Sequence, residues 1–198
     1  MNIVIGMPIL DKVEAQTVIS LVNLLFYSQK RQLHLSPSEG TTVVHEARNN
    51  VISQAYNTEF DAIMFIDSDV VFPGDMLEQF INHDKDIMGV LCVGKATSQQ
   101  NVFEYDSLAD EYKRLDLPLG GGLVEVDAVG ASILYIKRKV LDKIYQHRGP
   151  DYFFYEMGVG EDVSFCKLAK ELGFKIYVDT NINVGHIGKE IRRVNSDG

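Results

Sequence analysis

One segment constrains the fold of this chain more than any other. An uninterrupted apolar run at residues 62–66 stops abruptly at Asp67, Ser68 and Asp69. A short run of this kind is typical of a strand covered on both faces, as in the centre of a parallel sheet. In open α/β folds, ligands bind at the carboxyl edge of such strands. The segment therefore predicts an α/β fold with two carboxylates at its ligand-binding edge.

Strand and helix patterns alternate along the first half of the chain, and a mixed region follows. Together they predict one α/β domain over residues 1–198, with a mostly parallel central sheet, helices on both faces and a smaller mixed or antiparallel part. The polar segment 95–122 ends in three glycines and is interpreted as a surface excursion over an active site, with a small hairpin. The expected strands are 2–7, 31–37, 61–66, 86–94, 124–138 and 174–180, and the expected helices are 13–29, 44–57, 75–83, 140–147 and 161–172.

Two of the expected helices show their periodicity clearly. In the first, apolar residues at helical spacing predict an amphipathic helix; they are Val18, Leu21, Val22 and Leu25. In the second, Ala47, Val51 and Ala55 form one stripe. Residues 150–160 of the aromatic loop 148–160 and the segment 95–122 are expected to order over a donor or acceptor, with Tyr152, Phe153 and Tyr155 stacking on a sugar or packing in the core.

Composition and charge exclude several classes of protein. With 45% hydrophobic and 24% charged residues among 198, the chain is an ordinary globular domain. Its 19 basic and 28 acidic residues give a net charge of −9, which argues against a general nucleic-acid binder. The two cysteines, Cys92 and Cys166, favour buried thiols and a cytoplasmic location, in the host cytoplasm if the protein is viral. We expect no signal peptide and no transmembrane segment.

The Asp67-Ser68-Asp69 triplet carries the strongest chemical signal. Carboxylates at positions i and i+2 of an extended chain project to one side, and a hard divalent cation would relieve their repulsion. A capped turn after the strand is the structural alternative. The triplet also resembles the nucleophile loop of haloacid-dehalogenase-type phosphatases, although that loop usually lies near the start of a chain. A nucleotidyltransferase would use similar carboxylates, but residues 6–12 lack the glycine-rich basic loop that it needs.

Further candidates lie on other segments. Glu161 and Asp162 open a predicted helix, where they are either a charge pair favoured by the helix dipole or a general base. His186 lies between glycines after the last predicted strand, and an imidazole with two carboxylates suits Mn²⁺. Arg48 could clamp a phosphate or ribose or form a salt bridge. The basic tail could close over a diphosphate through Lys189, Arg192 and Arg193.

Taken in order, these motifs resemble small GT-A-fold glycosyltransferases, closest to short family-2-like enzymes of viral and bacterial polysaccharide pathways. The resemblance covers nearly the whole chain. It depends on the order of six motifs, namely Gly-Met-Pro at 6–8, Ala-Arg-Asn at 47–49, FIDSDVVF, VDAVGASILYIKR, GEDVSFC and VGHIG. The chain has no tryptophan, and residues 95–122 match no part of the family.

The resemblance implies a role for each matching residue. Asp67 and Asp69 would bind ribose and Mn²⁺ or Mg²⁺, with Asp69 the direct ligand, Ser68 beside the donor and His186 completing the metal shell. Glu161 and Asp162 would lie near the reacting carbon. The remaining donor-site residues are Pro8 and Ile9 around the base, usually uracil, Arg48 near the nucleotide, and Gly130 and Ala131 along the sugar pocket.

The function that the resemblance implies is metal-dependent transfer of a hexose or deoxyhexose from a nucleoside diphosphate, usually UDP, to a carbohydrate or other hydroxyl acceptor. Residues 1–94 would form the nucleotide-binding half and 95–198 the acceptor half. Inversion would use Asp162 or Glu161 as the base, whereas retention would leave that proton to the donor phosphate. A non-catalytic module that binds nucleotide sugars is a further hypothesis, which hydrolysis of a nucleotide sugar would separate from an enzyme.

Overall fold

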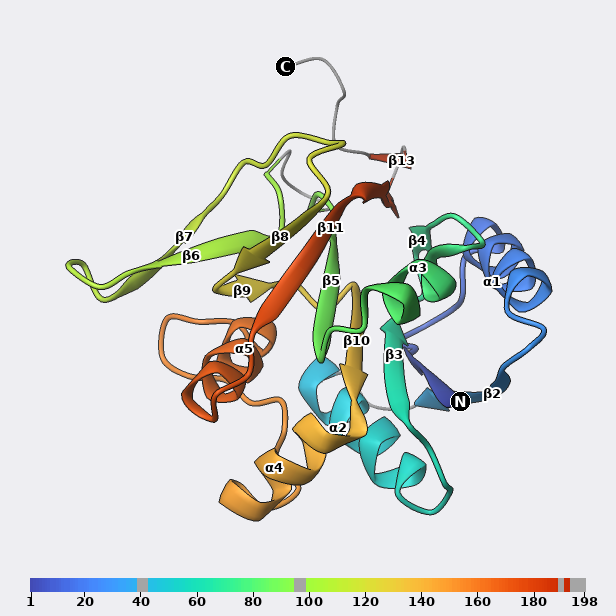
Figure 1. Cartoon of the computed structure of the whole chain (residues 1–198), viewed down its shortest axis with the longest axis horizontal. Helices are drawn as coiled ribbons and strands as arrows, with labels where there is room; N and C mark the ends of the chain where they lie inside the picture. The colour runs from blue at the N-terminus through green and yellow to red at the C-terminus, as the bar shows by residue number, and fades with distance from the viewer. Residues whose placement is uncertain (39–42, 95–98, 189–190, 193–198) are drawn as a thin grey trace.

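A mixed seven-stranded sheet forms the centre of the molecule (Figure 1). The computed structural model describes residues 1–38, 43–94, 99–188 and 191–192. The strand order is β2-β1-β3-β10-β5-β11-β8; β10 and β8 run against the other five strands, so the predicted mostly parallel sheet is confirmed. The strands are β1 (Asn2–Pro8), β2 (Gln32–Ser38), β3 (Ala62–Ile66), β5 (Ile87–Leu91), β8 (Leu123–Val126), β10 (Ile133–Lys137) and β11 (Ile176–Asn183).

Helices cover both faces of this sheet. The strand β3 shows why: Ile63 and Phe65 pack in the cluster with α2, α4 and α5, whereas Met64 and Ile66 pack in the cluster with α1 and α3. Every residue of β3 is fully buried, as the unbroken apolar run predicts. The helices are α1 (Ala15–Tyr27), α2 (Val44–Ala55), α3 (Met76–His83), α4 (Arg138–Arg148) and α5 (Glu161–Glu171).

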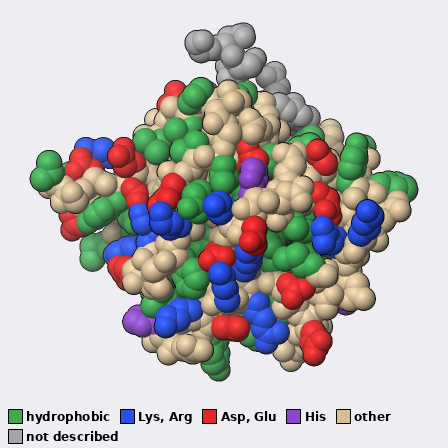
Figure 2. Space-filling view, viewed as in Figure 1, with side chains coloured by type: hydrophobic (Ala, Val, Ile, Leu, Met, Phe, Trp, Pro, Cys, Tyr) green, Lys and Arg blue, Asp and Glu red, His purple; other side chains and the backbone are tan. Residues whose placement is uncertain are grey.

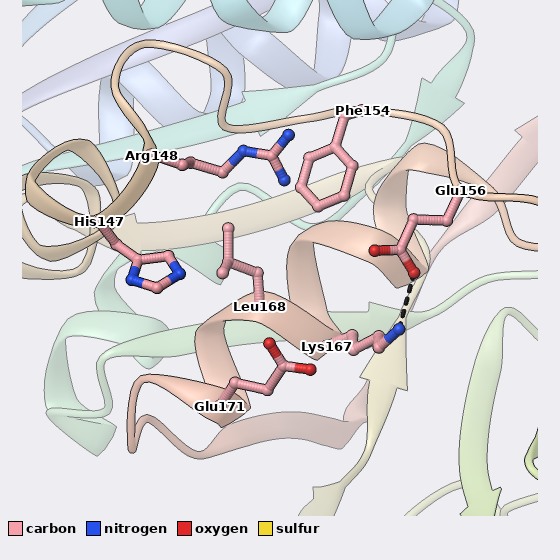
Figure 3. Close-up of a pocket in the computed structure, with 7 residues that line it drawn as sticks. All are labelled: His147, Arg148, Phe154, Glu156, Lys167, Leu168 and Glu171. Carbon is pink, nitrogen blue, oxygen red and sulfur yellow. Dashed lines mark hydrogen bonds and ion pairs between the residues drawn. The ribbon is translucent and has the colours of Figure 1, made fainter.

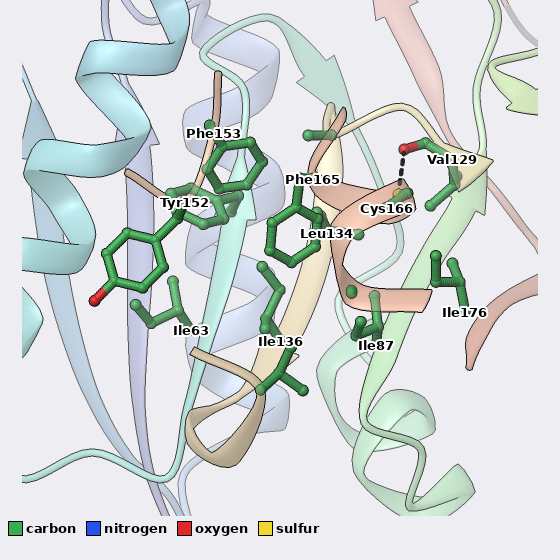
Figure 4. Packing of buried hydrophobic residues seen from close by; sticks show 14 of the residues in the cluster. Ile63, Ile87, Val129, Leu134, Ile136, Tyr152, Phe153, Phe165, Cys166 and Ile176 are labelled. Carbon is green, nitrogen blue, oxygen red and sulfur yellow. Dashed lines mark hydrogen bonds between the residues drawn. The ribbon is translucent and has the colours of Figure 1, made fainter. Parts of the chain in front are cut away.

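Part of the aromatic loop that precedes α5 packs in the hydrophobic core beneath this helix (Figure 4). Phe153 stacks on Phe165 with ring centroids 4.7 Å apart, and its edge meets Phe65 at 5.5 Å. Tyr152 and Phe153 are 1% and 0% exposed, so the expectation that they stack on a sugar is wrong. Tyr155, at 55% exposure, keeps its ring at the surface.

The orientation of α1 differs from what its periodicity suggests. The buried residues are Thr17, Ser20 and Leu24, whereas Val18 and Leu25 of the apolar stripe are 45% and 53% exposed. Small side chains let the helix lie close to the chain that follows β4 (Val70–Val71), where Ser20 Oγ accepts a hydrogen bond from the Phe72 amide at 3.2 Å. The amphipathic pattern is present, but most of its apolar stripe faces outward and only Leu21 packs against the core.

Two small three-stranded sheets extend the fold. One contains the hairpin expected within 95–122, of which residues 95–98 lie outside the described chain; it comprises β6 (Val102–Asp106), β7 (Glu111–Arg114) and β9 (Ala128–Val129). In the other, residues expected to form a tail are strands; it comprises β4 (Val70–Val71), β12 (Gly185–Ile187) and β13 (Ile191–Arg192). Within the described ranges, no helix is both long and apolar enough to cross a bilayer.

Candidate active site at the carboxyl edge of β3

The Asp67–Asp69 segment lies at the carboxyl edge of the sheet, as predicted. Its backbone is fixed by neighbouring segments, because the Asp67 amide donates to Ser132 O at 2.8 Å and Ser68 O accepts from the Glu14 amide at 2.9 Å. The parallel register of β1 and β3 pairs Gly6 with Phe65. The ends of these two strands therefore reach the same edge.

Arg48 is the centre of the site. It is 3% exposed, and its guanidinium bridges two carboxylates that are far apart in sequence. Its Nη2 donates to Asp67 Oδ1 at 3.0 Å and to the carbonyl of Ala131 at 3.2 Å, and its Nη1 donates to Glu161 Oε1 at 2.5 Å. One buried arginine thus connects the end of β3, the chain before β10 and the first turn of α5.

The packing of α2 explains how Arg48 reaches this position. Ala47 and Val51 are buried against the sheet, which directs the neighbouring Arg48 and Asn49 toward its edge. Asn49 Nδ2 donates to Phe153 O, and Asn49 Oδ1 accepts from the Phe153 amide, both at 2.9 Å. This paired hydrogen bond attaches the loop before α5 to α2 and so holds Glu161 within reach of Arg48.

The surroundings of Asp67 disfavour an isolated negative charge. Burial raises its pKa, Arg48 opposes that shift, and the like charge of Asp69 adds to it, so the pKa is about 6. The guanidinium already supplies one positive charge to this carboxylate. In this structure Arg48 therefore acts between carboxylates, and its expected contact with a nucleotide stays a prediction.

Glu161 and Asp162 occupy different environments, although they are adjacent. Glu161 is held by Arg48, whereas Asp162 Oδ1 accepts a hydrogen bond from the Val163 amide at 2.8 Å in the first turn of α5. Burial raises the pKa of Asp162, and the charge of Glu161 raises it further. Among the described residues Asp162 forms no ion pair, so it is the carboxylate of the two that is suited to accept a proton.

His186 meets Asp69 at the same edge. Strand β12 runs antiparallel to β4 and places His186 opposite Val70, so that His186 Nε2 lies 3.2 Å from Asp69 Oδ1. The other ring nitrogen, Nδ1, lies 3.0 Å from the carbonyl oxygen of Val93. Burial alone would lower the pKa of His186, but its contacts with Asp69 and Cys92 raise it to about 10.

This donor set fits a divalent cation that is shared with a substrate. A histidine that ligates a metal usually donates its other N–H to a carbonyl, and the contact of His186 Nδ1 with Val93 O provides that arrangement. Mn²⁺ and Mg²⁺ commonly take one or two protein donors together with phosphate oxygens. Among the residues that the structure describes, no group of three His, Cys, Asp or Glu side chains converges on one point. Asp69 and His186 are thus the natural pair, with Asp67 held by Arg48.

The other predicted donor-site residues surround this edge. Pro8 is the last residue of β1, and the Ile9 amide donates to the carbonyl of Ser38 at 3.0 Å. Gly130 is buried so closely that an added Cβ would lie 2.9 Å from Asn101, and Ala131 contacts Arg48. Arg192 is described only as the backbone neighbour of His186, and Lys189 and Arg193 lie outside the described residues.

Sequence reasoning missed one residue beside the site, His45, which packs against the predicted Tyr155. Their rings meet edge to face with centroids 4.9 Å apart. Burial raises the pKa of Tyr155, and the Glu161 carboxylate beside it raises that pKa further. His45 comes three residues before Arg48 on α2, and this helical spacing was the one available signal that it faces the site.

The fold is that of a GT-A-type glycosyltransferase. The crystal structure of A197 from STIV matches the whole chain and 91% of its own length, with a TM-score of 0.66 and 19% identity. GalNAc-T7 with UDP, GalNAc and Mn²⁺ matches 98% of this chain, with a TM-score of 0.59 and 11% identity, and S. aureus TarS matches 90%, with a TM-score of 0.53 and 15% identity. The chain spans 44% of the GalNAc-T7 chain and 35% of the TarS chain.

The family follows from the sequence itself. Residues 41–150, more than half of the chain, match the Anp1 family. The chain therefore belongs to the Anp1 family. No curated protein sequence matches it. The matched segment contains α2 with Arg48 and the Asp67–Asp69 triplet, whereas Glu161 and His186 lie beyond it.

Proposed function

We propose that this protein transfers a sugar from a nucleoside diphosphate, most simply UDP, to a hydroxyl acceptor with the help of a divalent cation. The observation that carries the proposal is the bridge from Asp67 through Arg48 to Glu161 at the carboxyl edge of β3. It joins the triplet expected to face the donor to the acidic pair expected to face the reacting carbon. GalNAc-T7 was solved with UDP, GalNAc and Mn²⁺, and TarS with UDP-GlcNAc, which supports the choice of donor.

The donor would be held by residues 1–94, and residues 95–198 would supply the sugar pocket and the acceptor side. Pro8 ends β1 and Ile9 follows it, at the edge of the sheet that carries the triplet, and the two residues would enclose the base there. Ser68 would contact the ribose, and Gly130 and Ala131 would line the sugar pocket. Gly130 packs against the side chain of Asn101, which fixes the backbone of this segment in place.

Asp69 and His186 would hold the cation, with Asp67 close by. When bound, Mn²⁺ or Mg²⁺ neutralises the negative charge that gathers on the leaving diphosphate. The residues of the chain would do the rest: Arg48 keeps Asp67 and Glu161 in position, and Asp162 takes the proton from the acceptor hydroxyl in an inverting reaction. The raised pKa of Asp162 makes it a stronger base than an ordinary surface carboxylate.

Turnover of nucleotide sugars tests the proposal directly. The protein is incubated with UDP-glucose, UDP-galactose, UDP-GlcNAc and UDP-GalNAc in Mn²⁺, and release of UDP is measured with and without simple glycoside acceptors. Release that falls at least about 100-fold in Asp69→Asn supports the proposal. Binding of UDP with no release from any donor would favour the non-catalytic module, and neither binding nor release would overturn the proposed donor.

A further inference from the structure

A second hollow opens between α2 and α4, away from the candidate active site. Its volume is about 540 Å³, within the range of small-molecule sites. Tyr56 lies eight residues after Arg48, which is about 12 Å along a helix axis. Helix α4 begins where β10 ends, opposite the start of β3, so the two helices meet below the sheet in Figure 1 at the edge opposite Asp67. Its lining includes Ser53, Tyr56, Asp142, Tyr145, Gln146 and Tyr152.

Three tyrosines dominate the wall of this hollow. The rings of Tyr56 and Tyr145 lie 6.4 Å apart at an angle of 41°, so they form two faces of an open corner. Tyr145 is 55% exposed, whereas Tyr152 is 1% exposed and belongs to the core. The surface open to a ligand is therefore that of the half-buried Tyr56 and the exposed Tyr145, two flat rings that cost little conformational entropy to order.

The polar groups of the lining are held in place. The Tyr56 hydroxyl donates to Asp142 Oδ1 at 2.7 Å, and Arg138 lies 5.4 Å above the Tyr56 ring and 3.6 Å from Asp142 Oδ2. Asp142 is the charged residue among the described lining residues, and Arg138 balances it. Exposed Ser53 and Gln146 add a hydroxyl and an amide, which both donate and accept hydrogen bonds.

We propose that this hollow binds a neutral pyranose unit of a carbohydrate, at a site separate from the donor site. A pyranose has an apolar C–H face that packs on an aromatic ring, and hydroxyl groups that need both donors and acceptors at its rim. The tyrosine corner supplies the first, and Asp142, Ser53 and Gln146 supply the second. A phosphate or a nucleotide is disfavoured, because the one charged residue of the described lining is a carboxylate and the neighbouring Arg138 is already paired with it.

A nearby pocket lacks the size and the free polar groups that a carbohydrate site requires (Figure 3). That pocket, between α4 and α5, has a volume of about 170 Å³, below the usual range for ligands. Its basic side chains already form ion pairs within the protein. Lys167 pairs with Glu156 at 2.8 Å, and Arg148 pairs with Asp151 at 2.7 Å and stacks on Phe154. The tyrosine-lined hollow is larger and keeps exposed hydrogen-bonding groups.

This inference depends on the lining of the hollow and not on the proposed transfer reaction. A carbohydrate that binds there would hold a glycan on the protein independently of turnover. The site would therefore persist when the donor site is disabled, and that persistence separates the two proposals experimentally.

Saturation-transfer NMR with the full chain tests the site. The probes are methyl glycosides of glucose, galactose, mannose, GlcNAc and GalNAc, without nucleotide or metal. We expect at least one probe to bind, with affinity reduced about fivefold or more in Tyr145→Ala and in Asp142→Asn. Tyr27→Ala is the matched control, because Tyr27 is 67% exposed on α1, on the other face of the sheet. Circular dichroism confirms that the variants are folded.

Three outcomes would overturn the inference. Saturation transfer to none of the probes at millimolar concentration would show that the hollow binds no pyranose. Binding that Tyr145→Ala leaves unchanged would place the sugar elsewhere. Binding that Asp69→Asn abolishes would assign the sugar to the candidate active site, whereas binding that survives Asp69→Asn supports a separate site.

Discussion

Replacing Arg48 with methionine tests the bridge that holds the candidate active site together. Methionine has similar length but no charge, so the variant leaves Asp67 and Glu161 without their shared cation. The side chains of these carboxylates are 25% and 12% exposed, and that of Arg48 is 4% exposed. Removing one partner of a buried ion pair typically costs about 3–5 kcal/mol. Because water reaches Asp67 in part, we expect the lower end, about 3 kcal/mol.

Two further variants separate lost attraction from lost packing. Arg48→Met combined with Glu161→Gln should recover about 1 kcal/mol, since one of the two stranded charges is then absent. Arg31→Met is the matched control: Arg31 makes two hydrogen bonds to Glu78, at 3.0 and 2.8 Å, but both side chains are more than 24% exposed. A partly exposed pair of this kind contributes about 1 kcal/mol or less.

Urea unfolding followed by circular dichroism provides the free energies, with unchanged m-values as the check on two-state behaviour. We expect the free energy of unfolding to be lowest for Arg48→Met, higher for the double variant and highest for Arg31→Met. If Arg48→Met is no less stable than Arg31→Met, the guanidinium is not a structural bridge, and the reasoning about this site fails.

Three other predictions concern catalysis, its pH dependence and packing. Asp162→Asn should lower transfer by about 10²–10⁴ while UDP binding persists, and wild-type turnover would leave Glu161 as the candidate base. Because the pKa of Asp162 is raised, its ionised form is lost as pH falls through a value above the ordinary ~3.9. We therefore expect kcat/KM to fall on the acidic side at a pH above ~3.9. A flat profile down to pH 4 would contradict the assignment. Gly89→Ala should destabilise by about 1–3 kcal/mol in urea, because its Cβ would lie 2.7 Å from Val129 Cγ2; no change would show that β5 tolerates the contact.

The sheet and its edge were predictable because their signals are local. The apolar run before Asp67 is long enough for one strand and has no polar residue, so burial on both faces was the consistent interpretation. The helical stripe of Ala47 and Val51 likewise gave the correct buried face of α2. In these cases short-range pattern and tertiary packing agree.

The missed features depend on contacts between distant segments. The stripe of α1 contains Val18 and Leu25, yet Thr17 and Ser20 face the protein, because a close approach to the chain after β4 favours small side chains. The periodicity of a helix without charged residues does not predict which of its faces will pack against the rest of the protein. The arginine bridge is of the same kind, since Arg48 and Glu161 are 113 positions apart and only the complete fold brings them together.

Figure 2 shows basic and acidic side chains intermixed over one face of the molecule, which agrees with the argument against a nucleic-acid surface. In a chain of net charge −9, a diphosphate meets an unfavourable field unless a cation is bound beside it. The proposed function therefore requires that the metal determine whether the donor binds.

Calorimetry with UDP is the most direct test of that requirement. Titrations are compared in EDTA and in Mn²⁺, for the wild type and for Asp69→Asn and His186→Ala. We expect micromolar binding, about −8 kcal/mol, in Mn²⁺ and at least about 100-fold weaker binding in EDTA. Both variants should lose most of the response to Mn²⁺. Equal affinity with and without the metal in the wild type would contradict the account.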